Sequence, residues 1–391
     1  MAYLRDRCIA YVLLFCGLVL GCGVGALAQS VIITIDAPGA GVSQGQGTGA
    51  AAIDASGAIT GSFYDSNFAC HGYVRKPDGN YITFDTPLGQ HGVATCPRPA
   101  SINAAGVITG VEFDQSFGCS NWPDTVGGCG GSHGFIRHPN GAIIVFDGPV
   151  DPSRSNPGTD PAGINVHGAV VGRYWTADQG SASTSFLRSA NGTFITFDAP
   201  DTNNRATPGA VGINGEGTIV GNFIDSNYSP HGYVRTRDGT FTIIDAPEAV
   251  NGTRIVGINS RGELAGVFWV GNASHGYVRT RDGTFTAFDV PGDCAGCIQV
   301  VALNDKGTVA GTFLTSASGG FFAQHGFLRA ADGTITTFDV PGAVNVIFGH
   351  VLPFTGVSGI NSSDAVVGSY QDANGIGHGY LRLAADPGDQ Q

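Results

Sequence analysis

A motif of four short pieces recurs seven times along this chain, and the repeat constrains the fold more than any other feature. The pieces are Ile-Asn, an apolar residue followed by x-Gly, His-Gly-Tyr-Val-Arg, and Phe-Asp-x-Pro, each with close variants. Successive third pieces begin 44 residues apart at His231 and His275, and 62 residues apart at His71 and His133. Many repeats of this length indicate a solenoid, a propeller or a similar array.

Each piece of the repeat has the character of a β-strand. Residues 284–289 mix β-forming and small polar residues, and no repeat contains a long stripe of apolar residues at helical spacing. Asp-Gly or Asn-Gly separates the third and fourth pieces in most copies, which favours tight hairpins. Four antiparallel strands in such a repeat match one propeller blade. We therefore expect an all-β fold, a seven-bladed β-propeller with four antiparallel strands per blade.

The two ends of the repeat region complement each other. Residues 31–38 match the fourth piece without the three that precede it, and residues 379–382 match the third piece without a fourth. We expect these segments to pair antiparallel and close the ring, because pairing removes two exposed sheet edges. Residues 29–385 then form a single propeller domain, and residues 386–391 a flexible polar tail.

The first 28 residues have the features of a secretory signal. Arg5 and Arg7 precede an apolar run over residues 8–20, and small residues at 26–28 suit cleavage before Gln29. An alternative is a lipoprotein box over residues 19–22, which would leave a lipid on Cys22. No later segment is long and apolar enough to be a transmembrane helix. The sequence thus predicts a secreted or cell-envelope protein.

Six cysteines remain after the signal region, and an even number in an exported chain predicts disulfides. Proximity in sequence favours the pairs Cys70–Cys96, Cys119–Cys129 and Cys294–Cys297, although other connectivities are possible. The C-x-x-C at Cys294 and Cys297 is interpreted as a loop staple. A zinc site would require a second pair of ligands at suitable spacing, which the sequence lacks.

The recurrent histidines are interpreted as structural residues. Catalysis requires one set of reactive residues at one place in the molecule, whereas a residue repeated in nearly every unit is expected to perform the same structural task in each. We expect hydrogen bonds between strands, with a buried partner whose loss costs about 1 to 3 kcal/mol. The recurrent Arg is expected to contact solvent or the neighbouring blade. The six histidines are His71, His133, His231, His275, His325 and His378.

Ligand binding is expected on the face that carries the longer connections, because variable loops on a rigid scaffold are common binding sites. Aromatic side chains there are candidates for stacking on sugar rings or anchoring a protein, and the alternative is that they pack loops against the blades. These candidates are Tyr64, Trp122, Tyr174, Trp175, Trp269 and Tyr370. The pairs at Asp65, Asp225 and Asp372, each with Asn two residues later, suit calcium or a tight turn. The turn is favoured, so no cofactor is expected.

The Ile-Asn-x-x-Gly, apolar-x-Gly and His-Gly-aromatic pieces resemble the HAF-type extracellular repeat of bacteria. That family is named for a His-Ala-Phe triplet, where this chain has His-Gly-Tyr or His-Gly-Phe. The resemblance covers residues 31–382. It implies an extracellular repeat protein and brings no catalytic residues with it.

Charge and motifs narrow the function. The net charge of −12 argues against nucleic acid as a partner. The sequence has no nucleophile elbow, P-loop, H-E-x-x-H or dinucleotide motif. We expect a monomeric, non-catalytic binding or envelope-structural propeller that recognises a glycan or a protein. The alternative is a secreted polysaccharide hydrolase or lyase with carboxylates on the same face.

Overall fold

The computed structural model describes residues 30–87, 95–114, 131–149, 158–175, 183–200, 209–294, 296–347 and 350–384. Within these residues the chain is all-β, as predicted, apart from a short 3-10 turn at Ser318–Gly320. The same residues include no helix long and apolar enough to cross a membrane.

In chain order the strands are β1 (Ile32–Ile35), β2 (Gly47–Ile53), β3 (Ile59–Tyr64), β4 (Cys70–Arg75), β5 (Tyr81–Phe84), β6 (Thr95–Ile102), β7 (Ile108–Asp114), β8 (Ser132–Arg137), β9 (Ile143–Phe146), β10 (Gly158–Ile164), β11 (Val170–Trp175), β12 (Thr184–Arg188), β13 (Phe194–Phe197), β14 (Gly209–Ile213), β15 (Ile219–Ile224), β16 (Pro230–Arg235), β17 (Phe241–Ile244), β18 (Thr253–Ile258), β19 (Leu264–Val270), β20 (Ala273–Arg279), β21 (Phe285–Phe288), β22 (Ile298–Leu303), β23 (Val309–Ser316), β24 (Phe322–Arg329), β25 (Ile335–Phe338), β26 (Val344–Ile347), β27 (His350–Pro353), β28 (Gly359–Ile360), β29 (Val366–Gln371) and β30 (Gly377–Arg382).

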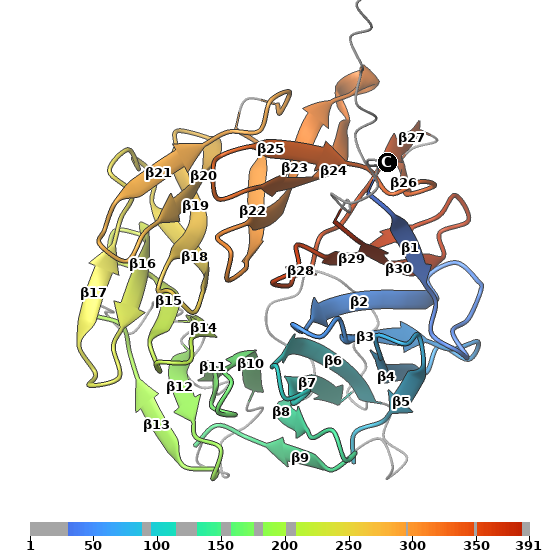
Figure 1. The fold of residues 1–391 in the computed structure, drawn as a ribbon, viewed down its shortest axis with the longest axis horizontal. Helices are drawn as coiled ribbons and strands as arrows, with labels where there is room; N and C mark the ends of the chain where they lie inside the picture. The colour runs from blue at the N-terminus through green and yellow to red at the C-terminus, as the bar shows by residue number, and fades with distance from the viewer. Residues whose placement is uncertain are drawn as a thin grey trace, which may run out of the picture.

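Four-stranded antiparallel units are the building blocks of the fold. Three stand as separate sheets, namely β14–β17, β18–β21 and β22–β25. Two eight-stranded sheets each consist of two such units, which meet at a single parallel bridge, Gly47 to Gly377 or Gly158 to Ser132. β26 and β27 form a separate hairpin. Figure 1 shows the units arranged around a common centre, with the first strand of each unit innermost.

We number the units along the chain. Units 1 to 6 are β2–β5, β6–β9, β10–β13, β14–β17, β18–β21 and β22–β25, and the terminal unit contains β28, β29, β30 and β1. The predicted pairing of the two chain ends is present. β1 runs antiparallel to β30, with Ile32 opposite Arg382 and Ile35 opposite Gly379. Ile35 is fully buried, so the N-terminal strand contributes to the core.

The glycine of each apolar-x-Gly piece is required by close packing. A Cβ atom at Gly266 would overlap the carbonyl oxygen of Arg254 on β18 and lie 2.7 Å from the Tyr277 ring on β20. Tyr277 is fully buried, so the ring has little room to move. The tyrosine or phenylalanine of the third strand therefore lies against the glycine of the second strand.

The recurrent Arg contacts the neighbouring unit, one of the two roles predicted for it. Arg188 lies over the Phe146 ring of the preceding unit at 4.9 Å, and Arg235 lies over Phe197 at 4.7 Å. Where Ile244 replaces this phenylalanine, Arg279 lies instead over Phe285 of its own unit at 5.6 Å. The Phe of the fourth strand and the Arg of the next unit thus form a cation–π contact between units.

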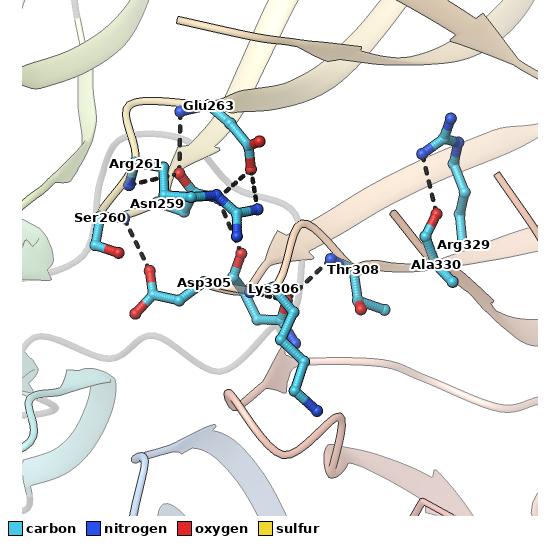
Figure 2. A network of polar contacts seen from close by, with 10 residues as sticks. Asn259, Ser260, Arg261, Glu263, Asp305, Lys306, Thr308, Arg329 and Ala330 are labelled. Atoms are coloured by element: carbon cyan, nitrogen blue, oxygen red, sulfur yellow. Dashed lines mark hydrogen bonds and ion pairs between the residues drawn. The ribbon is translucent and has the colours of Figure 1, made fainter. Parts of the chain in front are cut away.

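A belt of hydrogen bonds joins the innermost strands. In every unit except unit 1, the Asn that follows the first strand donates from Nδ2 to the main-chain oxygen at the same position of the next unit. Asn259 donates to Asn304 at 3.1 Å, and its Oδ1 accepts the main-chain N–H of Arg261 and Glu263 (Figure 2). The other links run from Asn103 to Asn165, Asn165 to Asn214, Asn214 to Asn259, Asn304 to Asn361, and Asn361 to Asp54.

Asp54 interrupts this belt, because a carboxylate has no N–H to donate to Asn103. We expect Asp54→Asn to stabilise the protein by about 1 kcal/mol, the typical contribution of a buried hydrogen bond. Asp54 is buried and its Oδ1 accepts the N–H of Ser56 and Ala58, contacts that Asn preserves. Urea unfolding of both proteins measures the change. A lower stability of the variant would show that the belt geometry does not extend to this position.

Candidate functional site

The molecule has two distinct faces. The tight turns after the first strand and between the third and fourth strands lie on one face, which we call the tight-turn face. The connections from second to third strand, and from fourth strand to the next unit, lie on the other, which we call the long-loop face. Described long-loop connections include residues 65–69, 225–229, 246–252, 289–294, 317–321 and 372–376.

The recurrent histidines lie at the long-loop end of the third strands and bind the recurrent aspartates of the fourth strands. In each pair Nδ1 of the imidazole lies 2.7 or 2.8 Å from an aspartate Oδ1. The predicted hydrogen bond between strands is therefore present. The pairs are His71–Asp85, His133–Asp147, His231–Asp245, His275–Asp289, His325–Asp339 and His378–Asp36.

The prediction that these pairs are buried is wrong. The Asp289 side chain is 58% exposed and that of His275 is 26% exposed, because the pair lies at the rim of the sheet. In most units the imidazole ring packs against an aromatic side chain of the second strand. The ring centroids of His275 and Phe268, for example, are 5.2 Å apart. The contribution of a pair is consequently that of a partly exposed contact, below the 1 to 3 kcal/mol expected for a buried one.

We expect His275→Ala to lower the free energy of unfolding by about 0.5 kcal/mol, since exposed ion pairs and hydrogen bonds contribute little. Chemical denaturation measures the change, and Asp289→Ala is the matched variant. The double variant should lose little more than either single variant, because both remove the same contact. A loss above about 2 kcal/mol for His275→Ala would contradict this estimate.

Two units depart from this arrangement. In unit 2 a glutamate, Glu112, occupies the position where other units place the aromatic side chain, and it lies opposite His133 in the β7–β8 ladder. Its side chain is fully buried. Sequence reasoning missed Glu112, although a single acidic residue within an apolar strand was a visible signal. A buried carboxylate beside an imidazole that binds Asp147 is a combination suited to proton transfer.

In unit 3 Thr184 replaces the histidine and lies opposite Tyr174. Burial raises the pKa of the Asp198 carboxyl, while a hydrogen bond from Thr184 opposes that shift. Burial also raises the pKa of the Tyr174 hydroxyl. Unit 3 therefore has a threonine, a tyrosine and an aspartate where other units have a histidine, an aromatic ring and an aspartate.

The predicted aromatic candidates fall into two groups. Tyr370 is buried, stacks on His378 at 5.0 Å and has its hydroxyl 3.2 Å from Thr34 Oγ1. Tyr174 is half-buried over Gly148, where an added Cβ would contact its ring. The Tyr64 hydroxyl lies 3.9 Å from Cys96 Sγ. These contacts fit the packing alternative.

The tryptophans differ from the tyrosines in having an arginine over the ring. Trp175 and Trp269 are half-buried, and an arginine lies over each ring: Arg173 at 5.9 Å and Arg254 at 5.5 Å. Trp122, also predicted as a ligand-binding residue, lies outside the described residues. Among the described candidates, Trp175 and Trp269 are thus the half-buried aromatic residues with an arginine over the ring.

Two of the three predicted disulfides lie in the described part of the chain. Cys70–Cys96 joins β4 of unit 1 to β6 of unit 2, and Cys294–Cys297 staples one long-loop connection. Cys119 and Cys129 lie outside the described residues. A covalent bond between units 1 and 2 fixes their relative position next to the strand that carries Glu112.

The Asp-x-Asn pairs form turns. Asp65 Oδ1 accepts the main-chain N–H groups of Ala69 and Asn67 at 2.8 Å, and these bonds lower the pKa of the Asp65 carboxyl. Asp225 and Asp372 accept equivalent bonds. Among the described residues no three His, Cys, Asp or Glu side chains cluster in a way that could hold a metal ion.

Comparison with known proteins places this arrangement in a fold class. No family model and no curated protein matches the chain. Solved structures do. One is virginiamycin B lyase from Staphylococcus aureus, solved as a catalytically inactive variant with quinupristin. The match has a TM-score of 0.54 and 13% sequence identity, and it covers 91% of this chain and 100% of the lyase. The chain has a β-propeller fold.

Two further structures support the same conclusion. A streptogramin B lyase matches at a TM-score of 0.54 and 15% identity, over 92% of this chain and 99% of that protein. The β-propeller domain of the Trilobed protease from Pyrococcus furiosus, which has an open velcro topology, matches at 0.54 and 11% identity, over 90% and 98%. At such low identity these similarities establish the propeller fold and do not transfer an activity.

Proposed function

We propose that the protein is an exported, closed, seven-bladed propeller that binds a glycan or protein ligand through its long-loop face without catalysing a reaction. Units 1 to 6 and the terminal unit are the seven blades in this proposal. The β1–β30 pairing and the hydrogen bond from Asn361 to Asp54 support closure, because both join the end of the chain to its beginning. The disulfides and the resemblance to HAF-type repeats support export.

The observation that carries the non-catalytic function is the repeated use of the histidines and aspartates. In six units the same imidazole binds the same carboxylate at 2.7 or 2.8 Å. Residues that do one task in many copies stabilise a scaffold. The features that differ between units, including the tryptophans with their arginines, lie at the long-loop face, where a specific ligand would be recognised.

Binding and release assays on the same polysaccharides test this function. The mature protein is applied to an array of polysaccharides, and the bound ones are incubated with it while reducing ends and unsaturated products are measured. Binding without product supports the proposal. Release of product would replace it with the enzymatic alternative.

Glu112 is the observation that favours that alternative. A fully buried carboxylate opposite His133, which binds Asp147 at 2.8 Å, has the components of a general acid–base site. If product is released, Glu112→Gln should abolish release while leaving polysaccharide binding intact. The equivalent change at a paired aspartate of another unit, Asp289→Asn, is the matched control and should leave release unchanged.

The exported form is tested separately. Mass spectrometry of the protein from medium and membrane fractions should find an N-terminus at Gln29. A lipid on Cys22 would show instead that the protein is anchored to a membrane surface.

A further inference from the structure

Arg254 and Trp269 form an unusual pair at the long-loop end of unit 5. Arg254 is the second residue of β18, an innermost strand, and lies opposite Val267 of β19. Trp269 follows Val267 by two residues and therefore projects from the same side of the sheet. The guanidinium carbon of Arg254 lies 5.5 Å from the centre of the indole ring.

Hydrogen bonds fix the backbone at Trp269. The main-chain N–H of Trp269 donates to the main-chain oxygen of Gly252, and the main-chain oxygen of Trp269 accepts the N–H groups of Val250 and Asn251. The ring also packs against the apolar cluster that contains Ile298 and Val300 of unit 6. The Arg254 guanidinium lies over this ring and the residue is exposed, so its outward N–H groups are available to a ligand.

Arg254 has no ion-pair partner among the described acidic side chains, and it is exposed. Two other arginines with accessible side chains do have such a partner. Arg173 binds Asp160 at 3.2 Å, and Arg281 binds Glu216 at 3.1 Å. An exposed guanidinium beside an aromatic ring and without a carboxylate of its own is arranged to bind a carboxylate on another molecule, because the two groups form paired hydrogen bonds.

Related pairs occur in two other units of the described part of the chain. Arg98 lies over Phe113 at 4.9 Å in unit 2, and Arg173 lies over Trp175 at 5.9 Å in unit 3. All three pairs lie on the two inner strands of their unit, and in unit 3 both residues belong to the second strand. Burial lowers the pKa of Arg98, and Arg173 already binds Asp160, so Arg254 is the one of the three most open to a ligand.

We propose that Arg254, oriented by Trp269, is a binding subsite for the carboxylate of an acidic sugar, and that the ligand is a uronate-containing polysaccharide. This inference rests on the proposed function and specifies its ligand. The edge of the indole ring beside the guanidinium offers an apolar surface to the sugar ring. The protein carries a net charge of −12, which repels polyanions in general. Binding of an acidic polysaccharide therefore requires a local cationic site of this kind.

Affinity electrophoresis of the mature protein in gels containing polygalacturonate, dextran sulfate or dextran tests the subsite. We expect retardation by polygalacturonate, little by dextran sulfate and none by dextran. Arg254→Gln should weaken binding to polygalacturonate by at least about tenfold, since a charge-assisted hydrogen bond is lost. Arg254→Lys should recover part of the loss, because it restores the charge without the planar fork.

Arg237→Gln is the matched control. Arg237 is exposed in the hairpin between β16 and β17, on the tight-turn face, so the change removes the same charge far from the subsite. Its binding should equal that of the unaltered protein. Trp269→Leu should weaken polygalacturonate binding while Arg254 remains present, which separates orientation of the guanidinium from its charge.

Four other results of these binding experiments would contradict the proposal. Unchanged polygalacturonate binding by Arg254→Gln, or equal retardation by dextran sulfate, would refute the subsite. Retardation by dextran alone would refute the acidic ligand and leave a glycan-binding propeller. Retardation by none of the three would refute the acidic-sugar subsite. The binding assay on the polysaccharide array would then test the proposed function independently.

Discussion

Removal of residues 31–38 is expected to cost at least about 4 kcal/mol of unfolding free energy, a large fraction of the stability of a typical domain. The deletion removes β1 and its pairing with β30. It also removes the fully buried Ile35 side chain and the Asp36 partner of His378. β30 would then present an unpaired edge, so aggregation should accompany the loss of stability. Thermal unfolding and size-exclusion chromatography measure both effects.

Deletion of residues 386–391 is the matched control for this experiment. The segment is short and polar in sequence, and we expect its loss to change stability by less than about 0.5 kcal/mol. Equal tolerance of the two deletions would mean that the N-terminal strand does not contribute to the terminal unit.

Gly266→Ala should destabilise the protein by about 3 kcal/mol, the upper part of the range for overpacking in a tight core. The added methyl group would overlap the main-chain oxygen of Arg254 and press on the buried Tyr277 ring. Relief requires the β18–β19 ladder to separate or the ring to leave its pocket. Equilibrium denaturation in urea gives the change.

Gly257→Ala, on the neighbouring strand, is the control for backbone entropy. A Cβ atom at Gly257 would meet no atom within 4 Å. This substitution should be neutral or stabilise by up to about 1 kcal/mol, because alanine restricts the unfolded chain. Similar losses at both positions would show that chain flexibility, and not close packing, accounts for the glycines in the repeat.

The sequence was sufficient to predict features that depend on one unit or on the order of units along the chain. Strand type, the tight turns and the pairing of residues 31–38 with the C-terminal strand all follow from the repeat. Gly283 illustrates the reason: its φ of 100° belongs to a local turn that Asp-Gly favours in any context. The partners of the histidines could likewise be assigned to the strands beside them.

Contacts between units could not be predicted in the same way. The donation from Asn259 to Asn304, and the position of Arg235 over Phe197, depend on how one sheet lies against the next. Burial of the histidines was misjudged because the repeat indicates that a strand ends there without indicating how far the rim is exposed. Glu112 was missed because the sequence alone does not show that its position is fully buried.

Hydrogen–deuterium exchange of the mature protein tests the central claim, a closed ring, most directly. Closure predicts that amides of residues 32–35 and 379–382 exchange slowly, and at the same rate as those of the paired strands in units 4 and 5. It also predicts that all of them lose protection together as urea is added, since the units would unfold as one. Rapid exchange at residues 32–35, with protection retained in units 4 and 5, would contradict the closed ring.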